Sequence, residues 1–440
     1  MKTVEAVLVG SGCRGFEVVG KFARRFPHKL KIVAVAEPID WRRETFADDF
    51  GIEPERRFKE WGELAEKPQL AEVLFNMTGD IQHVPITREA LRKGYHVLLE
   101  KPIADTPEGC LELADVADET DRILQLGLCL RFTPFYQTAA EILHSGRIGQ
   151  VITVDYQESI SCTHMAHSFV RGNWSNRKAA SPMIISKSCH DLDMLIWLLG
   201  SECKKVSSFG SLKYFNSKNA PDGAPKRCTD GCPHEHMCPF SAIKLYVKNV
   251  SGVELGFGSA GWYVCPSNDP QERMEALKTS PYGRCVYHCD NDVVDHQVVT
   301  MEFEDGQTVA FTMQGFATPS GGDSLWGPNQ TNAGRRFTFW GTDGVLRAPT
   351  YGHLELTDHS IGHTEKMQTG FPEGSHGGGD FSMIHNFLDA VQQGSNAQAV
   401  ASVKECVHGH LIGFAAEHSR LTGRTVDIDE WSSSLLTSNR

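Results

Sequence analysis

Three glycines near the start of the chain have the spacing of a phosphate-binding loop. They are Gly10, Gly12 and Gly15 in the segment GSGCRG, which directly follows the apolar run VEAVLV. In this pattern the first glycine permits a tight turn, the second lets the backbone approach a pyrophosphate, and the third allows a helix to pack closely on the strand. The N-terminus of that helix attracts negative charge. The loop, which also contains Cys13 and Arg14, is therefore expected to hold a dinucleotide.

An acidic residue at the end of the second apolar run indicates which dinucleotide. Glu37 follows LKIVAVA and stands 22 residues beyond Gly15. Its carboxylate can accept hydrogen bonds from the hydroxyls of an adenosine ribose and would repel a ribose phosphate, which favours NAD over NADP. Arg42 and Arg43 stand close enough in sequence to weaken that preference. The alternative is a glycine-rich turn in a protein that binds no nucleotide.

A lysine at the end of a later apolar run has the chemistry to act on an alcohol. The segment LLEKPIADT places Glu100 and Lys101 at the end of the run YHVLLE. Ligands of open α/β sheets bind beyond the carboxyl ends of the strands, so Lys101 is expected to face the nicotinamide end of the crevice. Oxidation of a secondary alcohol needs a base for the hydroxyl proton and a donor that stabilises the developing alkoxide. Lys101 can polarise the hydroxyl.

The elements that must position these residues follow from the pattern of the first 130 residues. Helical stretches are expected over residues 16–25, 41–50, 86–93 and 107–118, between the apolar runs VEAVLVG, LKIVAVAE, AEVLFNMT, YHVLLE and ILQLGLCL. Continuous Val/Ile/Leu runs separated by helices are typical of strands buried on both faces of a parallel sheet. We therefore expect a doubly wound α/β domain over residues 1–130.

The remaining residues, 131–440, have a different texture. Alternating runs such as VITVDYQES and QTVAFTMQGF indicate a large mixed or antiparallel sheet with one open face, in a second domain of the α+β class. A long Cys-, Pro- and Gly-rich insertion is expected near residues 216–290. Helical spacing returns over residues 380–421 and predicts a closing pair of helices. The open sheet face makes a homo-oligomer the expected assembly.

Taken together, these motifs resemble a known family. The EKP strand end, the glycine fingerprint and the segment NMTGDIQHVP, which carries Thr78 and His83, are similar to the Gfo/Idh/MocA family of NAD(P)-dependent sugar and polyol oxidoreductases. The similarity covers the first domain closely and the second more loosely. It implies a Rossmann domain that binds NAD, a small carbohydrate as substrate, and a cofactor site that includes Thr78, His83 and Glu100.

The same resemblance extends to a motif in the second domain, where this chain departs from the family. The family has a tryptophan element followed by D-x-x-x-H-x-x-D; here these positions hold Trp174, expected beside the cofactor, then His190 and Asp193. The first aspartate is replaced by Ser186, with Lys187 beside it. Many members use that aspartate with the histidine to polarise the substrate, so their mechanism does not transfer unchanged.

The catalytic expectations are therefore specific to this chain. We expect His190 to act as acid and base, Lys101 to polarise the hydroxyl, and Lys187 to assist, since a lysine crowded by another cation can have a lowered pKa. The alternatives are a core histidine that is satisfied by the backbone and a lysine that is solvated or ion-paired.

The substrate is expected to meet a dense set of polar side chains. The segment THMAHSFVRGNW supplies His164, His167 and Arg171, and sugars are recognised through several fixed polar partners. Arg131 in LRFTP and Asp193 complete the candidates for substrate binding. A structural loop network explains these residues nearly as well, and Arg131 either lines the crevice or caps the domain junction.

A cysteine cluster in the insertion raises the question of a metal. Cys228, Cys232 and Cys238 stand in RCTDGCPHEHMCP, with two histidines between them, and two further cysteines follow in RCVYHC. Thiolates and imidazoles at this density suit a structural zinc that would fix a polar loop. The spacings C-x3-C and C-x5-C differ from those of zinc fingers, so buried thiols and turn residues are the alternative. Chemistry at Lys101 needs no catalytic zinc.

Composition excludes several classes of partner. The 440 residues carry 43 basic and 55 acidic side chains, a formal charge of -12, and no basic block, so a nucleic-acid partner is not expected. The apolar stretches fall far short of the roughly 20 residues needed to span a bilayer, and Glu5 interrupts any signal segment. We expect no membrane partner and a cytoplasmic protein whose 13 cysteines are thiols or metal ligands.

Three functions fit these observations. The first is an NAD-dependent oxidoreductase that acts on a secondary hydroxyl of a sugar, glycoside or polyol. The second is a glycosidase that retains NAD: transient oxidation at C3 acidifies the C2 proton, elimination expels the aglycone, and the hydride is returned. His164, His167 and Lys187 would suit its additional proton transfers. The third is a non-catalytic sensor of sugar or dinucleotide on the same fold.

Overall fold

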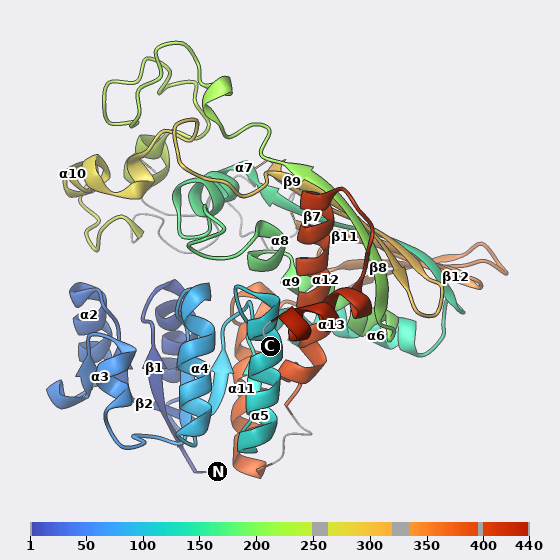
Figure 1. Cartoon of the computed structure of the whole chain (residues 1–440), viewed down its shortest axis with the longest axis horizontal. Coiled ribbons are helices and arrows are strands. Elements are labelled where there is room, and N and C mark those ends of the chain that lie inside the picture. Colours follow the sequence, from blue (N-terminus) through green and yellow to red (C-terminus); the bar gives the residue numbers. More distant parts are fainter. Residues whose placement is uncertain (1, 249–262, 319–333, 395–398, 439–440) are drawn as a thin grey trace.

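The computed structural model describes residues 2–248, 263–318, 334–394 and 399–438 of the chain. Figure 1 shows two sheet-containing parts, one built from the blue N-terminal elements and one from a long, curved sheet in green to orange. Within the described ranges, no helix has both the length and the apolar character needed to cross a membrane.

The first part contains a six-stranded parallel sheet in the order β3-β2-β1-β4-β5-β6. The strands are β1 (Val4–Val9), β2 (Leu30–Ala36), β3 (Arg57–Phe58), β4 (Val73–Asn76), β5 (His96–Leu99) and β6 (Leu124–Leu126). Strand order reverses between β1 and β4, and such a switch point is where open α/β sheets bind ligands. The predicted doubly wound Rossmann sheet is confirmed.

Helices cover both faces of this sheet, as continuous buried strands require. They are η1 (Gly15–Gly20), α1 (Lys21–Arg25), α2 (Asp40–Phe50), η2 (Pro54–Arg56), α3 (Trp61–Ala65), η3 (Asp80–Gln82), α4 (His83–Arg92) and α5 (Pro107–Thr120). The start of α5 shows the local cause: Pro107 stands at the first helical position, and the Thr106 hydroxyl accepts a hydrogen bond from the Gly109 amide.

The second part contains a nine-stranded mixed sheet in the order β14-β13-β12-β11-β7-β10-β9-β8-β15. Its strands are β7 (Val151–Ser161), β8 (Cys203–Ser211), β9 (His296–Phe303), β10 (Thr308–Ala317), β11 (Gly334–Gly341), β12 (Gly344–Thr350), β13 (His353–Asp358), β14 (Thr364–Gln368) and β15 (Val426–Asp427). Buried and exposed residues alternate along β9 and β10, so one face packs on the core and the other lies open. This confirms the predicted α+β part.

Helices pack on one face of the second sheet and connect it to the first part. They are η4 (Cys129–Phe132), α6 (Pro134–His144), α7 (Cys162–His164), η5 (Met165–Arg171), α8 (Met183–Ser186), α9 (Cys189–Leu199), η11 (His376–Gly378), α11 (Gly379–Gln393), α12 (Val403–Thr422) and α13 (Ile428–Ser438). The closing helices predicted within 380–421 are present as α11 and α12.

Helix α11 returns to the first sheet. Phe381 and Phe387 on this helix pack edge-to-face on Phe22 and Phe75 of the first part, with ring centroids 5.5 and 5.9 Å apart. Figure 1 accordingly shows α11 beside α5 rather than with the second sheet. The division into residues 1–130 and 131–440 stays a prediction.

The insertion between β8 and β9 carries η6 (Ser217–Asn219), η7 (Ile243–Lys248), α10 (Pro270–Thr279) and η10 (Pro281–Gly283), while its residues 249–262 lie outside the described ranges. Some of its buried residues form a small separate core that includes Cys228, Tyr246 and Leu277, while others, such as Phe215 and Cys285, belong to the main core. In Figure 1 this segment, with α10 in yellow, lies above the ends of α2 and β1.

Candidate active site

The glycine loop leaves room for a ligand at one of its three glycines. Gly10 has a φ of +88°, and a Cβ there would lie 2.7 Å from the Met77 carbonyl oxygen; a Cβ on Gly15 would lie 2.2 Å from the Gly10 oxygen. A Cβ on Gly12 would meet nothing within 4 Å. Two glycines thus close the turn between β1 and η1, while the backbone at Gly12 faces open space of the kind a pyrophosphate needs.

Glu37 lies at the end of β2 and is buried against the glycine loop. One carboxylate oxygen accepts a hydrogen bond from the Ser11 amide at 2.9 Å, and the other accepts one from the Ile39 amide at 3.0 Å. Each oxygen retains a second lone pair for a ribose hydroxyl. Arg43 turns back to the Glu37 carbonyl at 2.9 Å and pairs with Asp40, which keeps its charge away from that carboxylate.

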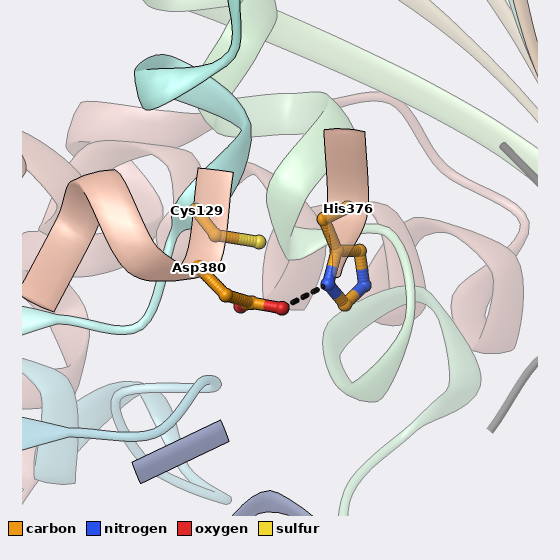
Figure 2. A group of neighbouring side chains, drawn as sticks. All are labelled: Cys129, His376 and Asp380. Carbon is orange, nitrogen blue, oxygen red and sulfur yellow. Dashed lines mark hydrogen bonds and ion pairs between the residues drawn. The ribbon is translucent and has the colours of Figure 1, made fainter. Parts of the chain in front are cut away.

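Arg14 bridges the glycine loop, the EKP strand end and the start of α11. Its Nε lies 2.6 Å from a Glu100 carboxylate oxygen, and its two terminal nitrogens lie 2.8 and 3.2 Å from the Asp380 carboxylate. A carboxylate oxygen of Asp380 also lies 2.8 Å from His376 Nδ1, within hydrogen-bond distance; Figure 2 shows this contact. Burial alone would raise the pKa of Asp380, but Arg14 and His376 outweigh it and lower that pKa.

Cys129, His376 and Asp380 form one group of neighbouring potential metal ligands, with ligand atoms within 4.8 Å of one another. It is the one such group among residues that the structure describes. The Arg14 guanidinium already pairs with both Asp380 oxygens, so this carboxylate is not free to bind a cation. The group is better described as a histidine oriented by a buried carboxylate.

Thr78 and His83 fix the shape of the neighbouring strand ends. The Thr78 hydroxyl donates to the Asn76 side chain at 2.7 Å. His83 is buried, with Nδ1 2.6 Å from the Pro102 carbonyl oxygen and Nε2 3.2 Å from that of Thr78. His83 therefore joins the loop after β4 to the EKP loop after β5.

Lys101 lies between the two parts of the molecule. Its Nζ donates to the Ser186 carbonyl oxygen at 2.7 Å and lies 5.3 Å from the centre of the Trp174 ring. Trp174 is held in turn by its Nε1, which donates to Asp80 at 3.0 Å. The position where the family motif has an aspartate thus contributes a backbone oxygen to Lys101, and one of the three ammonium donors is used.

His190 is buried beside these cations. Burial, followed by the charges of Lys101 and Arg335, lowers its pKa well below the usual value, so the imidazole is neutral at pH 7. Its Nδ1 is buried and has no hydrogen-bond partner within the described part of the chain. A neutral imidazole with an unused ring nitrogen can accept a proton.

Lys187 is paired rather than solvated. Its Nζ lies 3.0 Å from Glu158 on β7, and the other Glu158 oxygen lies 3.3 Å from Arg335, which also binds Asp191 at 2.5 Å. Burial raises the pKa of Glu158, but Arg335 and Lys187 outweigh it and lower that pKa. Glu158 therefore supplies a buried carboxylate that pairs with Lys187, the residue after Ser186.

His164 belongs to the same cluster. Burial lowers its pKa well below the usual value, and the charges of Lys187 and Lys101 lower it further. The charges of Lys101 and Lys187 therefore act on both His164 and His190. The catalytic and substrate-binding roles of these four residues stay predictions.

The other substrate candidates are engaged elsewhere. Arg131 and Asp193 form a buried two-bond ion pair at 2.7 and 2.8 Å that ties η4 to α9. His167 bonds the Tyr246 hydroxyl at 2.8 Å and stacks on Tyr282, with ring centroids 4.8 Å apart. These side chains therefore make the contacts expected of a structural network that holds the loops in place. Their role in substrate binding stays a prediction.

Arg171 and the predicted metal ligands lie together in the insertion. Arg171 donates to the carbonyl oxygens of Arg284 and Phe240 at 2.7 and 2.6 Å. Cys228, Cys232 and Cys238 line one cavity with it, and all three are free thiols.

Sequence reasoning missed His376, Asp380, Glu158 and Arg335. The segment HGGGD carries a signal, since a histidine and an acid flank three glycines at the start of a predicted helix, in the same way that the first glycine loop precedes one. Glu158 and Arg335 carry no local signal, because they stand in alternating strand patterns and are paired only by strand order.

Comparisons with known proteins agree with this architecture. Residues 4–128 match the model of the GFO_IDH_MocA family, described as an oxidoreductase family with an NAD-binding Rossmann fold, and residues 140–428 match the C-terminal α/β domain of that family.

Individual relatives are distant. The Bacillus subtilis protein YteT is 22% identical over 357 residues, which cover 75% of this chain and 78% of YteT. The scyllo-inositol 2-dehydrogenase (NAD(+)) of Bacillus subtilis is 27% identical over 215 residues, 48% of this chain and 58% of that relative. A levoglucosan dehydrogenase solved with NADH and levoglucosan has a TM-score of 0.67 at 17% identity, covering 97% of this chain and 99% of that one. The structural likeness establishes the fold.

Proposed function

Because the chain belongs to the GFO_IDH_MocA oxidoreductase family, we propose that it is an NAD-dependent enzyme that oxidises or reduces a secondary hydroxyl of a sugar, glycoside or polyol. One observation carries the proposal: the Lys101 ammonium lies at the end of β5, beside Trp174, and its charge acts on a buried, neutral His190. A hydrogen-bond donor and a proton acceptor at one strand edge are what alcohol chemistry requires.

The residues of the crevice fit a dinucleotide. Gly12 leaves the backbone open to a pyrophosphate, and Glu37 at the end of β2 offers lone pairs to ribose hydroxyls, which supports NAD over NADP. Bound NAD supplies a two-electron acceptor or donor. The residues proposed around it are Gly10, Gly12, Cys13, Arg14, Gly15, Glu37, Thr78, His83, Glu100, Lys101 and Trp174.

The proposed roles of the catalytic side chains follow from their protonation. The Lys101 ammonium uses one N–H for Ser186 and can donate another to the substrate oxygen, which stabilises developing negative charge. Neutral His190 takes the hydroxyl proton during oxidation and returns it during reduction. Lys187, held by Glu158, assists as a second positive charge.

Substrate hydroxyls are proposed to meet His164, which shares the cluster with Lys101. The Arg131–Asp193 pair holds α9, the helix that carries His190, and so positions the proton acceptor. His167 and Arg171 contact the insertion, and we propose that they affect substrate binding by holding the insertion in position.

A second enzymatic function has a specific observation in its favour. His376 lies beside the proposed base His190, with ring centroids 6.5 Å apart, and the charge of Lys187 contributes to the lowered pKa of both His190 and His164. These are further groups able to move protons. A simple dehydrogenase needs one acid and base, whereas oxidation at C3, removal of the C2 proton and protonation of the leaving group need several. Glycoside cleavage with recycled NAD is therefore the second proposal.

Turnover with a substrate panel separates the two proposals. Purified full-length protein would be incubated with NAD+ and inositols, aldoses, anhydrosugars or aryl glycosides, with NADH and aglycone measured together. Stoichiometric NADH with an intact glycosidic bond supports the dehydrogenase, and aglycone release without net NADH supports the glycosidase. Denaturing the protein and assaying released nicotinamide shows whether the cofactor is retained.

The variant Lys101→Met tests the observation on which both proposals rest. We expect kcat to fall about 100- to 10,000-fold, because a positioned donor is lost. The Kd for NAD+ should stay within about threefold, since the glycine loop is untouched. Lys59→Met, an exposed lysine on the surface of the first part, is the matched control. Undiminished turnover by Lys101→Met would show that the assignment is wrong.

The open face of the second sheet supports a homo-oligomer. Phe209, Val298 and Phe316 on β8, β9 and β10 are exposed, with 74% of the Phe209 surface accessible. Phe209 and Val298 are direct cross-strand neighbours. We infer that a second copy covers this face, which light scattering of the purified protein would test.

We also place the protein in the cytoplasm, since its 13 cysteines are all unpaired thiols.

A further inference from the structure

Four cysteines from two distant segments surround one small cavity in the insertion. Cys228, Cys232 and Cys238 come from one loop, and Cys285 comes from the segment after η10. The two segments pair directly: the Cys228 amide donates to the Gly283 carbonyl and the Cys285 amide donates to the Lys226 carbonyl, both at 2.9 Å. The cavity has a volume of about 20 Å³, the size of a single ion or water molecule.

The same cavity is lined by a buried positive charge that lacks a counter-charge. Arg171 is 1% exposed, and no carboxylate lies within ion-pair distance of it in the described ranges. Its Nε and one terminal nitrogen donate to backbone carbonyls, and the Tyr246 hydroxyl, which also bonds the guanidinium, carries no charge. A buried charge without a partner is costly, so the site lacks negative charge.

Neutral thiols do not supply that charge. A cysteine thiol without a metal ion is largely uncharged at pH 7. The bonded terminal nitrogen of Arg171 lies 3.6 Å from Cys228 Sγ, within the distance of an N–H to sulfur hydrogen bond. A divalent cation that displaces four thiol protons would convert the cysteines into acceptors for the guanidinium.

We propose that Cys228, Cys232, Cys238 and Cys285 bind one Zn²⁺ as thiolates, with Arg171 donating to the sulfurs. Four thiolates and Zn²⁺ carry a net charge of -2, which the buried guanidinium partly neutralises. Four thiols give up four protons on binding, and no redox change occurs. Thiolate ligands in a closed tetrahedral set are typical of structural zinc.

Binding requires the side chains to turn inward. In a tetrahedral zinc site with Zn–S bonds near 2.3 Å, the sulfurs lie about 3.8 Å apart. Among the described residues, no three of these four sulfurs lie within 4.8 Å of one another. The four side chains would therefore rotate on binding; the bridge between Arg227 and Arg284 already holds Cys228 and Cys285 on neighbouring segments.

The zinc site would fix the insertion against the cofactor crevice. Tyr263 in the insertion is hydrogen-bonded to Cys13 of the glycine loop, and Tyr282 stacks on His167. Loss of the ion would loosen this cover and weaken NAD binding. This consequence rests on the proposed function, whereas the zinc site itself does not.

Metal analysis of full-length protein purified without a histidine tag tests the site. We expect about one equivalent of zinc, reduced below about 0.2 equivalent in Cys228→Ser and in Cys285→Ser. Cys265→Ser is the matched control, because Cys265 is a half-buried thiol of the same insertion that does not line the cavity. Less than 0.1 equivalent in the wild type, iron in place of zinc, or full zinc retention in both variants would overturn the proposal.

A second measurement covers the case in which the variants fail to fold. Titration of wild-type thiols with a mercurial reagent, with a chromogenic chelator present, should release one zinc as four thiols react. Release of no zinc would contradict the site. The Kd for NAD+ is then compared before and after zinc removal, with circular dichroism as a check on the fold. A rise of about tenfold is expected; an unchanged Kd contradicts the covering role, and no NAD binding in either form contradicts the proposed function alone.

Discussion

At the residue scale, Asp380 lies in a row of contacting charged and titratable side chains that connects the EKP loop to the start of α11. Glu100, Arg14, Asp380 and His376 follow one another with contacts of 2.6, 2.8 and 2.8 Å. The carboxylate fixes the orientation of the His376 ring through Nδ1, in the manner of the acid in a catalytic triad. The His376 ring lies next to that of His190, so we infer that it is the second proton-transfer group of the site.

His376→Asn tests that role. We expect kcat to fall about 10- to 100-fold, because an oriented proton carrier is lost, while the KM for NAD+ stays within about twofold. Asp380→Asn should differ, since it also releases Arg14, and should raise the KM for NAD+ as well. Steady-state kinetics of both variants check the split. His359→Asn, an exposed histidine, should match the wild type, and an unaltered kcat in His376→Asn would exclude the residue.

The residues that sequence could place are those whose role depends on local spacing. Gly10, Gly12, Gly15 and Lys101 follow apolar runs directly, and a parallel sheet carries such strand ends to one edge. Asp193 shows the limit. Its type and motif position fit a substrate ligand, but Arg131 occupies it from 62 residues away. The packing of the folded chain determines which residues pair at that separation in sequence, and no local sequence pattern predicts such pairs.

At the element scale, the three glycines in the turn between β1 and η1 have two different functions. Gly10 and Gly15 are required by the fold, because a Cβ at either would collide with backbone atoms at 2.7 or 2.2 Å. Gly12 has no such neighbour, so its absence of a side chain serves a ligand rather than the turn. Substitutions at Gly10 and Gly15 should therefore lower the stability of the protein, whereas a substitution at Gly12 should lower its affinity for the cofactor.

Alanine substitutions measure that separation. Gly12→Ala should leave the Tm within about 2 °C of the wild type and raise the Kd for NAD+ at least tenfold, because the added methyl group occupies the space of the pyrophosphate. Gly15→Ala should lower the Tm by several degrees, since its Cβ meets the Gly10 carbonyl at 2.2 Å. Calorimetry gives both quantities. A Gly12→Ala protein with unchanged NAD affinity would place the dinucleotide elsewhere.

At the scale of the whole molecule, α12 joins the second sheet to the loop that carries Lys101. His410 on this helix is fully buried; its Nδ1 donates to the Cys406 carbonyl at 2.9 Å, and its Nε2 accepts from the Ile103 amide at 3.1 Å. This pairing fixes the neutral tautomer, because a protonated Nε2 would face an N–H donor. Burial accordingly lowers the pKa of His410 to about 4.

This histidine makes the contact between the two parts sensitive to acid. An unfolded chain takes up a proton on His410 below about pH 6.5, whereas the folded chain does not until about pH 4, so stability falls as the pH falls through that window. The expected loss is about 1.4 kcal/mol per pH unit. Asp380, whose pKa is lowered, contributes stability that is lost only at lower pH, as the pH falls from the ordinary carboxylate range toward its folded value.

His410→Gln isolates the effect, because a glutamine oxygen can accept from Ile103 and does not titrate. The variant should be less stable than the wild type at pH 7.5, through imperfect packing, and the difference should shrink by about 2.5 kcal/mol between pH 7 and pH 4.5. Denaturant unfolding at several pH values measures it. His28→Gln, an exposed histidine, should show a constant difference. Parallel stability curves for His410→Gln and the wild type would mean that α12 does not hold the catalytic loop through a neutral imidazole.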